Sequence, residues 1–250
     1  MSIDPVCGAA VDERRAPATA FHRGCIYYFC SVEHRDMFLQ SPDSYSPRVP
    51  CAALKIGIMG SASGELPVPV RTAAFNLGVA AADKGLIVIT GAAPGLPWES
   101  ARGARSRGGL SIGISPALSL DEHVNFYQSP SDVFDVIIYT GSGLMGREIV
   151  NIRSSDMVAI VGGHSGTLGE FAIAFDEGKL IGVLTGSGGI ADIVPDLVKA
   201  MDKQTGANIL YESDPRTLVD RLVENYVQEH FQKPSVFVRN SHGGEARLPG

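Results

Sequence analysis

The chain has 250 residues, of which 44% are hydrophobic and 19% charged, and its formal charge is −6. This composition supports a sizeable folded core and excludes a globally disordered chain. The acidic balance argues against a nucleic-acid partner, which favours a basic surface. No apolar run reaches the ~18 residues of a membrane span, and the first residues lack a secretory-signal pattern. We therefore expect a cytoplasmic protein with reduced thiols and no membrane partner.

All of the cysteines lie near the amino terminus: Cys7, Cys25, Cys30 and Cys51. In a reducing compartment such a cluster is more typical of a metal site than of disulfides. Residues 41–50 hold three prolines and three serines, and proline interrupts helices and central strands because it lacks an N–H donor. The resulting prediction has four parts: a small module over 1–46, a linker over 47–52, a large domain over 53–232 and a tail over 233–250.

In the small module, the aromatic run 27–29 predicts a strand and residues 32–39 a helix. Cys30 and His34 stand four residues apart at that boundary, so both can face one ion. Cys7 lies in a turn marked by Asp-Pro and glycine, from which a thiolate can project. Sulfur and nitrogen ligands suit zinc or another thiophilic metal.

The segments Asp4-Pro5-Val6-Cys7-Gly8 and Tyr27-Tyr28-Phe29-Cys30-Ser31 resemble the YHS domain, a small metal-binding module. The resemblance covers about residues 3–46. The family usually has a further cysteine four residues after its Tyr-Phe-Cys motif, where this chain has His34. The set Cys7, Cys25, Cys30 and His34 would supply four tetrahedral ligands. The alternative is that these cysteines are small buried hydrophobic residues and hold no ion.

The large domain repeats one pattern of strand, glycine-rich turn and helix. Continuous apolar runs, without alternation, indicate strands buried on both faces. The predicted strands are 55–59, 86–90, 110–114, 133–139, 157–161, 180–184 and 208–211. Predicted helices cover 68–84, 98–107, 190–201 and 215–231, with two more ending near 154 and 176. This order predicts an α/β fold with a doubly wound, Rossmann-like parallel sheet.

Ligands of such sheets bind at the carboxyl ends of the strands, and helix N-termini behind glycine-rich turns attract phosphate. The sequence therefore predicts a phosphate-bearing ligand, a nucleotide. The candidate binding residues are Gly60, Ser61, Gly91, Gly162, Gly163, His164, Ser165, Gly166 and Thr167. Gly141-x-Gly143-x-x-Gly146 matches the spacing of the dinucleotide fingerprint, but the next strand ends without an acidic residue, which argues against a classical NAD site.

The segment from Arg147 through Ser155-Asp156 to Gly162-Gly163, followed by Gly166-Thr167-x-x-Glu170, looks like the LOG family. The resemblance covers about residues 53–230. Members cleave the N-glycosidic bond of nucleoside 5′-monophosphates and release a free base and ribose 5-phosphate. By position, Glu170 matches the catalytic glutamate and Arg147 the catalytic arginine. The resemblance also implies at least a homodimer, and we expect no cofactor for the cleavage itself.

This chain departs from the hydrolases at Val161, where they have proline, and at His164-Ser165, where they have one residue. These changes favour wider relatives such as the molybdenum cofactor carrier proteins, which keep the phosphate cradle without hydrolysis. Two functions stay open: a nucleoside monophosphate hydrolase, and a nonhydrolytic carrier of a phosphate-bearing nucleotide or cofactor. A third option makes the small module a sensor whose metal occupancy tunes the large domain.

Cleavage of a glycosidic bond builds positive charge on the ribose, which a carboxylate stabilises. Glu170 is the candidate for that role. No second carboxylate is evident from the spacing. Glu99 and Glu148 are available, although Glu148 is equally well explained as a solvated helix residue.

Overall fold

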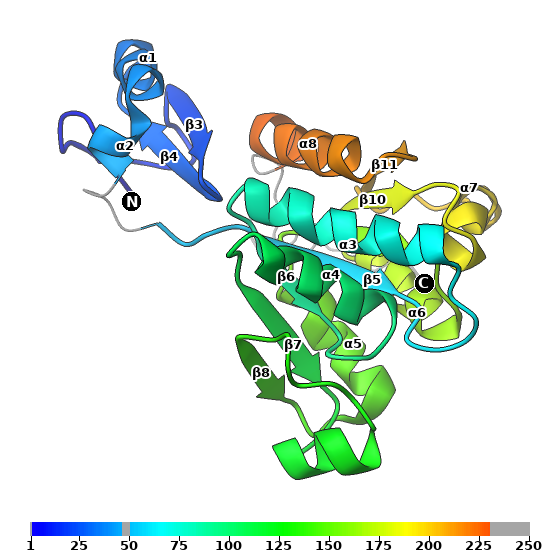
Figure 1. Cartoon of the computed structure of the whole chain (residues 1–250). Helices are drawn as coiled ribbons and strands as arrows, with labels where there is room; N and C mark the ends of the chain where they lie inside the picture. The colour runs from blue at the N-terminus through cyan, green and yellow to red at the C-terminus, as the bar shows by residue number, and fades with distance from the viewer. Residues whose placement is uncertain (1, 47–50, 231–250) are drawn as a thin grey trace.

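The computed structural model describes residues 2–46 and 51–230, so the predicted tail over 233–250 and most of the linker lie outside the described residues. A seven-stranded parallel sheet forms the centre of the large domain, in the order β11-β10-β9-β5-β6-β7-β8 (Figure 1). Its strands are β5 (Lys55–Gly60), β6 (Ile87–Thr90), β7 (Ser111–Ser115), β8 (Val136–Tyr139), β9 (Met157–Val161), β10 (Leu180–Leu184) and β11 (Asn208–Glu212).

The strand order confirms the doubly wound topology. The chain adds β6, β7 and β8 outward from β5, returns to place β9 on the other side of β5, and then adds β10 and β11. The direction of winding therefore reverses between β5 and β9. In sheets of this kind the crevice at the carboxyl ends of the two strands flanking the reversal is where ligands bind.

Helices cover both faces of the sheet. α3, α4 and α8 pack together on one face, and α5, α6 and α7 on the other. Their bounds are α3 (Val68–Asp83), α4 (Leu96–Ser106), α5 (Gly143–Arg153), α6 (Ser165–Asp176), α7 (Gly189–Met201) and α8 (Pro215–Asn225), with π-helical turns at η2 (Glu122–Phe126) and η3 (Tyr226–His230). The predicted helix over 215–231 therefore ends as α8 at Asn225, before a wider turn.

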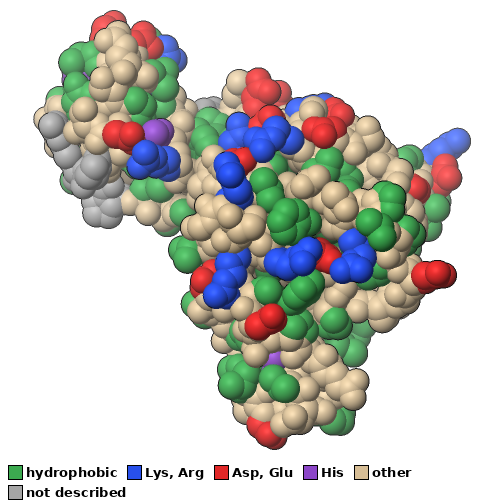
Figure 2. Space-filling view, in the orientation of Figure 1, with side chains coloured by type: hydrophobic (Ala, Val, Ile, Leu, Met, Phe, Trp, Pro, Cys, Tyr) green, Lys and Arg blue, Asp and Glu red, His purple; other side chains and the backbone are tan. Residues whose placement is uncertain are grey.

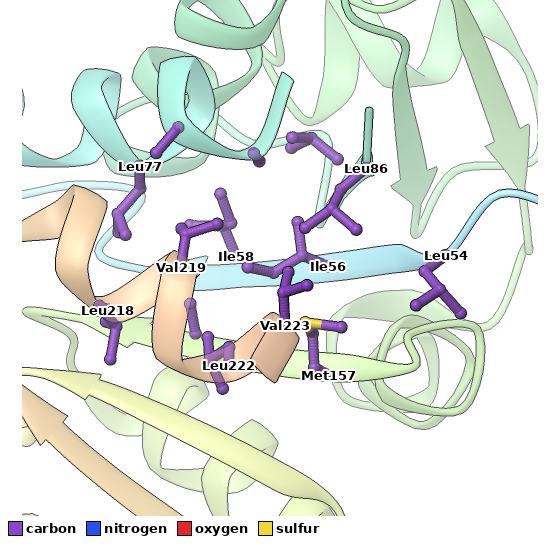
Figure 3. Close-up of a cluster of buried hydrophobic side chains, with 14 of the residues drawn as sticks. Leu54, Ile56, Ile58, Leu77, Leu86, Met157, Leu218, Val219, Leu222 and Val223 are labelled. Atoms are coloured by element: carbon purple, nitrogen blue, oxygen red, sulfur yellow. The ribbon is translucent and has the colours of Figure 1, made fainter. Parts of the chain in front are cut away.

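The hydrophobic core of the large domain is built from the apolar runs of the sequence. Every residue of β9 and β10 is buried, and side chains of β5 and β9 meet those of α3 and α8 in one cluster (Figure 3). Each fully buried Leu or Ile in this cluster contributes about 1.5–3 kcal/mol. α3 and α4 approach closely because Gly78 faces the backbone of Ser100 and Gly103 faces the backbone of Phe75.

Figure 2 shows positive and negative side chains interspersed over the face formed by α3, α4 and α8. Asp83 on α3 pairs with both Arg107 and Arg216, and Lys84 pairs with Asp220. The basic residues of this face are thus tied to acidic neighbours.

Among the described residues, no helix is long and apolar enough to cross a membrane.

The small module forms its own lobe (Figure 1). An antiparallel hairpin turns at Arg23 and Gly24, which both have positive φ, as a tight hairpin turn requires. Ser31 caps the following helix by accepting a hydrogen bond from the His34 backbone N–H, and Phe29 and Phe38 are fully buried. The elements are β1 (Ser2–Ile3), β2 (Ala10–Val11), β3 (Ala18–His22), β4 (Cys25–Phe29), α1 (Val32–Gln40) and α2 (Pro42–Tyr45).

The module packs against the amino-terminal end of the sheet. The Leu54 N–H, just before β5, donates to the Gly24 carbonyl at 2.6 Å, and Gly24 contacts the backbone of Gly85, just before β6. Ile26 and Tyr28 join the same apolar cluster as β5 and α8. The module therefore shares a core with the large domain and lies at the end of the sheet opposite the carboxyl ends of the strands.

Candidate functional site

A cleft of about 190 Å³ opens at the carboxyl ends of β5 and β9, where the winding reverses. Its walls are the turn after β5, Gly91 after β6, the start of α5 and the first turns of α6. The lining includes these sequence candidates: Gly60, Ser61, Gly91, Arg147, His164, Ser165, Gly166, Thr167 and Glu170. Residues from four separate turns and helices thus meet at the place that the topology favours for a ligand.

Gly162 and Gly163 stand just behind the cleft wall. Both have positive φ, which glycine adopts without strain. The Gly162 N–H donates to Ser187 Oγ at 2.8 Å, and the Gly163 N–H donates to Ser61 Oγ at 2.9 Å. These two amides are therefore already hydrogen-bonded within the protein, and both glycines shape the turn.

The first turn of α6 presents the anion-attracting feature of the cleft. Ser165, Gly166 and Thr167 begin the helix, and the cap residue His164 makes no side-chain hydrogen bond to it. The first N–H groups of a helix lack partners within the helix and carry a partial positive charge. An anionic oxygen in the cleft can accept from these amides and from the Thr167 hydroxyl.

Glu170 lies one turn further along α6 and is 6% exposed. Its Oε1 accepts a hydrogen bond from Asn151 Nδ2 of α5 at 3.0 Å. Burial raises the pKa of Glu170 to about 7, against the opposing charge of Arg147 and the bond from Asn151. A pKa near neutrality suits a group that must take up and release a proton.

Arg147 reaches the cleft from α5 and lies against Gly91. A side chain at Gly91 would occupy the position of the Arg147 guanidinium. The Nε atom of Arg147 is buried and, among the described residues, has no hydrogen-bond partner. An unpaired buried donor on a cleft wall is costly unless a ligand supplies the acceptor.

Glu148 is 3% exposed and lines the cleft, so the interpretation as a solvated helix residue is wrong. Its carboxyl lies on the first turns of α6, where a Cβ at Gly169 would come within 2.6 Å of Oε2. Burial raises its pKa, although the Arg147 charge opposes this. Glu99, the other acid considered, is buried between Arg71 and Arg102 and does not line this cleft. The cleft therefore holds two carboxyl groups, Glu148 and Glu170.

A second cluster lies in the small module. One ligand atom each from Asp4, Cys7, Cys30 and His34 lies within 4.8 Å of the others. The Cys7 and Cys30 sulfurs are 3.7 Å apart, and His34 Nδ1 is 3.3 Å from the Cys30 sulfur. Two thiolates at ~2.3 Å from a tetrahedral zinc ion lie about 3.8 Å apart, so this spacing fits zinc.

Asp4 organises this cluster. Its fully buried carboxylate accepts from the backbone N–H groups of Val6, Cys7 and Cys30 and meets His34 Nδ1 at 2.9 Å. Burial opposes its ionisation, but these hydrogen bonds outweigh the burial and hold the pKa of Asp4 far below its usual range. A permanently charged carboxylate therefore faces the thiols.

The structure does not bring Cys25 to this cluster. Cys25 begins β4 and Cys30 follows its end, and at ~3.3 Å per residue a strand separates them by about 16 Å. Cys25 instead contacts the thiol of Cys51, whose pKa is raised to about 12 by burial and by that contact. Asp4 takes the place that the sequence prediction gave to Cys25.

Three residues of these sites were not predicted. Asn151 stands three and four residues after Glu148 and Arg147, a helical spacing that indicates a shared face. Asp4 is visible in the sequence only as part of a turn. Ser187 carries no local signal, because it meets Gly162 through a contact across 25 residues.

The fold is a doubly wound α/β architecture with a cleft at the point of reversal. The SLOG cluster4 family profile matches residues 53–219, and the chain belongs to that family. An uncharacterized protein from Archaeoglobus fulgidus is 34% identical over 131 residues, which cover 52% of this chain and 80% of that protein.

Two solved structures share the fold of the large domain. The molybdenum cofactor binding protein from Rippkaea orientalis is 27% identical with a TM-score of 0.58, covering 70% of this chain and 98% of its own. The molybdenum cofactor carrier protein from Chlamydomonas reinhardtii is 27% identical with a TM-score of 0.57, covering 70% and 99%. The expectation of a LOG-like, Rossmann-like large domain is confirmed.

Proposed function

We propose that the large domain hydrolyses the N-glycosidic bond of a nucleoside 5′-monophosphate. The observation that carries this proposal is Glu170, a buried carboxyl with a pKa near neutrality, placed one helical turn from an anion-attracting helix N-terminus. A phosphate held by the amides of residues 165–167 would set the sugar beside this carboxyl. The enclosed volume of about 190 Å³ is below the ~300 Å³ of typical small-molecule pockets, so it suits the phosphate and ribose, with the base toward the opening.

The reaction replaces the bond between C1′ and the base nitrogen with a bond from C1′ to a water oxygen. Positive charge develops on the ribose as the base leaves, and ionised Glu170 stabilises that charge and accepts the proton of the attacking water. Asn151 holds the Glu170 carboxylate in place. Arg147 favours the ionised form of Glu170 and offers its unpaired Nε–H to a ligand oxygen.

The test uses purified protein and a panel of the common nucleoside 5′-monophosphates, with chromatographic detection of free base. We expect release of at least one base and a loss of about 10²-fold or more in Glu170→Gln, as for removal of a charge-stabilising or proton-transferring group. Glu177→Gln is the matched control, because Glu177 lies at the far end of the same helix and pairs with Arg153. Base release that is equal in Glu170→Gln and wild type would refute the assignment.

A second candidate function is a nonhydrolytic carrier of a phosphate-bearing cofactor. It is favoured by the similarity to the two molybdenum cofactor proteins and by Val161, which stands where the hydrolases have proline. The same cleft would hold the cofactor phosphate at the α6 N-terminus. A ligand that co-purifies intact, together with no base release from any nucleotide, would favour this function over hydrolysis.

We also propose that the small module is a YHS-like zinc site formed by Asp4, Cys7, Cys30 and His34. The sulfur spacing and the charged Asp4 beside two thiols support it. We expect about one zinc ion per chain by elemental analysis, loss of that ion in Cys30→Ser, and full retention in the control Cys25→Ser. Equal zinc content in the two variants would contradict this ligand set.

Pairing of two copies is a further part of the proposal. Exposed apolar side chains lie on η2, β8 and α5, namely Phe126, Val136, Ile138, Leu144 and Met145, and exposed apolar patches mark interaction sites in soluble proteins. Light scattering is expected to give at least a dimer, and Met145→Glu to shift it toward the monomer. A monomeric wild-type protein would exclude the pairing.

A further inference from the structure

We propose that Glu148 is the acid that protonates the departing base, so that the cleft works with two carboxyl groups in opposite roles. This inference rests on the hydrolysis proposed above. An unprotonated base is a poor leaving group, and Glu148 is the residue that donates the proton the base needs in order to leave.

The Glu148 carboxyl is isolated from hydrogen-bond donors. It lines the cleft and is 3% exposed, and within residues 2–46 and 51–230 no group donates a hydrogen bond to it. An ionised carboxylate without donors is expensive to bury, whereas a neutral carboxylic acid is far less so. A neutral acid on a cleft wall is a hydrogen-bond donor that lacks an acceptor, and a ligand would supply one.

The space for the Glu148 carboxyl is built into α6. Gly166 and Gly169 face Glu148, and a Cβ at these positions would lie 3.5 Å from Oε1 and 2.6 Å from Oε2. Any side chain at Gly169 would collide with the carboxyl. The absence of a side chain at Gly169 therefore lets α5 set Glu148 directly against the wall of the cleft.

Charged groups of both signs face Glu148. Arg147 on its own helix favours ionisation, whereas Glu170 on α6, on the same cleft wall, repels a second negative charge. His164 on the cleft rim is exposed. A bound phosphate would add negative charge nearby. Burial, Glu170 and the ligand all favour the neutral form of Glu148, against Arg147 alone.

The two carboxyl groups are distinguished by their hydrogen bonds. Glu170 accepts from Asn151, which stabilises its ionised form, and Glu148 has no such donor. Burial also raises the pKa of Glu170 to about 7, so the division of the pair into a base and an acid rests on this difference in hydrogen bonds. In the reaction the C1′–N electron pair passes to the base nitrogen and the Glu148 proton joins that nitrogen. Water bonds to C1′, and its proton goes to Glu170 before exchange with solvent restores both groups.

The experiment compares two leaving groups in wild type, Glu148→Gln and Glu170→Gln. A nucleoside 5′-monophosphate found to be cleaved needs a protonated base, whereas 4-nitrophenyl riboside 5-phosphate releases a stable anion without one. For Glu148→Gln we expect kcat on the nucleotide to fall about 10²-fold or more, kcat on the nitrophenyl substrate to change less than about threefold, and KM to change little. Glu170→Gln is expected to slow both substrates.

Several outcomes would overturn the inference. If Glu148→Gln slows both substrates equally, or raises KM for both without changing kcat, Glu148 binds the shared ribose 5-phosphate part and donates no proton to the base. If wild type cleaves the nitrophenyl substrate but no nucleotide, no acid assists a natural base. If wild type cleaves neither substrate, the hydrolysis itself is refuted, and the role of Glu148 with it.

A second measurement does not depend on turnover. In wild type, infrared spectra at neutral pH are expected to contain a protonated-carboxyl band that Glu148→Gln lacks. Identical spectra in that region would show that Glu148 is ionised and would overturn the assignment. Thermal unfolding of each variant verifies that the near-isosteric amide leaves the fold intact.

Discussion

Replacing Glu170 with glutamine is expected to stabilise the protein at alkaline pH while abolishing its proposed activity. Glu170 is 6% exposed, and burial raises its pKa from 4.5 to about 7. The folded protein therefore holds this proton more tightly than the unfolded chain does. Stability linked to Glu170 is fully present below pH 4.5 and is lost as the pH rises through 7.

The magnitude follows from the two pKa values. At about 1.36 kcal/mol for each pKa unit, a rise from 4.5 to about 7 corresponds to about 3 kcal/mol of lost stability above neutrality. The amide of the Glu170→Gln variant carries no titrating proton, and its oxygen can still accept the hydrogen bond from Asn151. The variant therefore does not lose this stability. Its free energy of unfolding, relative to that of wild type, should grow by about 3 kcal/mol between pH 4.5 and pH 8.

The assay is urea unfolding of wild type, Glu170→Gln and the control Glu177→Gln at several pH values across this range. We expect the difference between Glu170→Gln and wild type to be smallest near pH 4.5 and largest above pH 7, and the difference for Glu177→Gln to stay nearly constant. A Glu170→Gln difference that does not change with pH would mean that Glu170 titrates normally. The account of Glu170 as a buried group poised near neutrality would then be refuted.

Three other substitutions test separate parts of the structure. Gly91→Ala is expected to displace the Arg147 guanidinium with little loss of stability. Because small misplacements of binding groups slow catalysis strongly, kcat/KM for base release should fall by about 10²-fold. Unchanged kinetics would exclude a role for Arg147. Ser61→Ala leaves the buried Gly163 N–H without its acceptor and should cost about 1–3 kcal/mol in chemical unfolding, whereas a neutral result would mean that another acceptor replaces it. Asp4→Asn removes the charge that faces the thiols and should weaken zinc binding by about 10–100-fold in chelator competition; an unchanged affinity would show that Asp4 only shapes the turn.

The central strands could be predicted almost residue by residue, because a strand buried on both faces needs an uninterrupted apolar run. β9 and β10 match their predicted bounds for this reason. β3 was not predicted, because the short segment Ala18–His22 has no continuous apolar run and is held by its pairing with β4. α4 begins at Leu96, two residues earlier than expected, since Pro97 is tolerated in the first turn of a helix.

Cleft residues that belong to one local sequence motif could be predicted. Contacts between residues that are far apart in the sequence could not. Arg147 and Glu170 follow from the resemblance to the LOG-family motif, and both line the cleft. The engagement of the Gly163 amide by Ser61 joins residues 102 apart, so no local pattern reveals it. The burial of Glu148 likewise depends on contact with another helix, at Gly169, which is why the sequence left that residue open.

The shared core of the two lobes has a practical consequence for dissecting this protein. Ile26 and Tyr28 pack with residues of β5 and α8, and the Leu54 N–H bonds to Gly24. Cutting the peptide chain between residues 46 and 51 would leave this contact in place, so the two fragments should co-migrate on gel filtration and separate only in denaturant. For the same reason the large domain expressed alone would expose part of its own interior and is expected to aggregate, so the intact chain is the smallest unit suited to binding measurements.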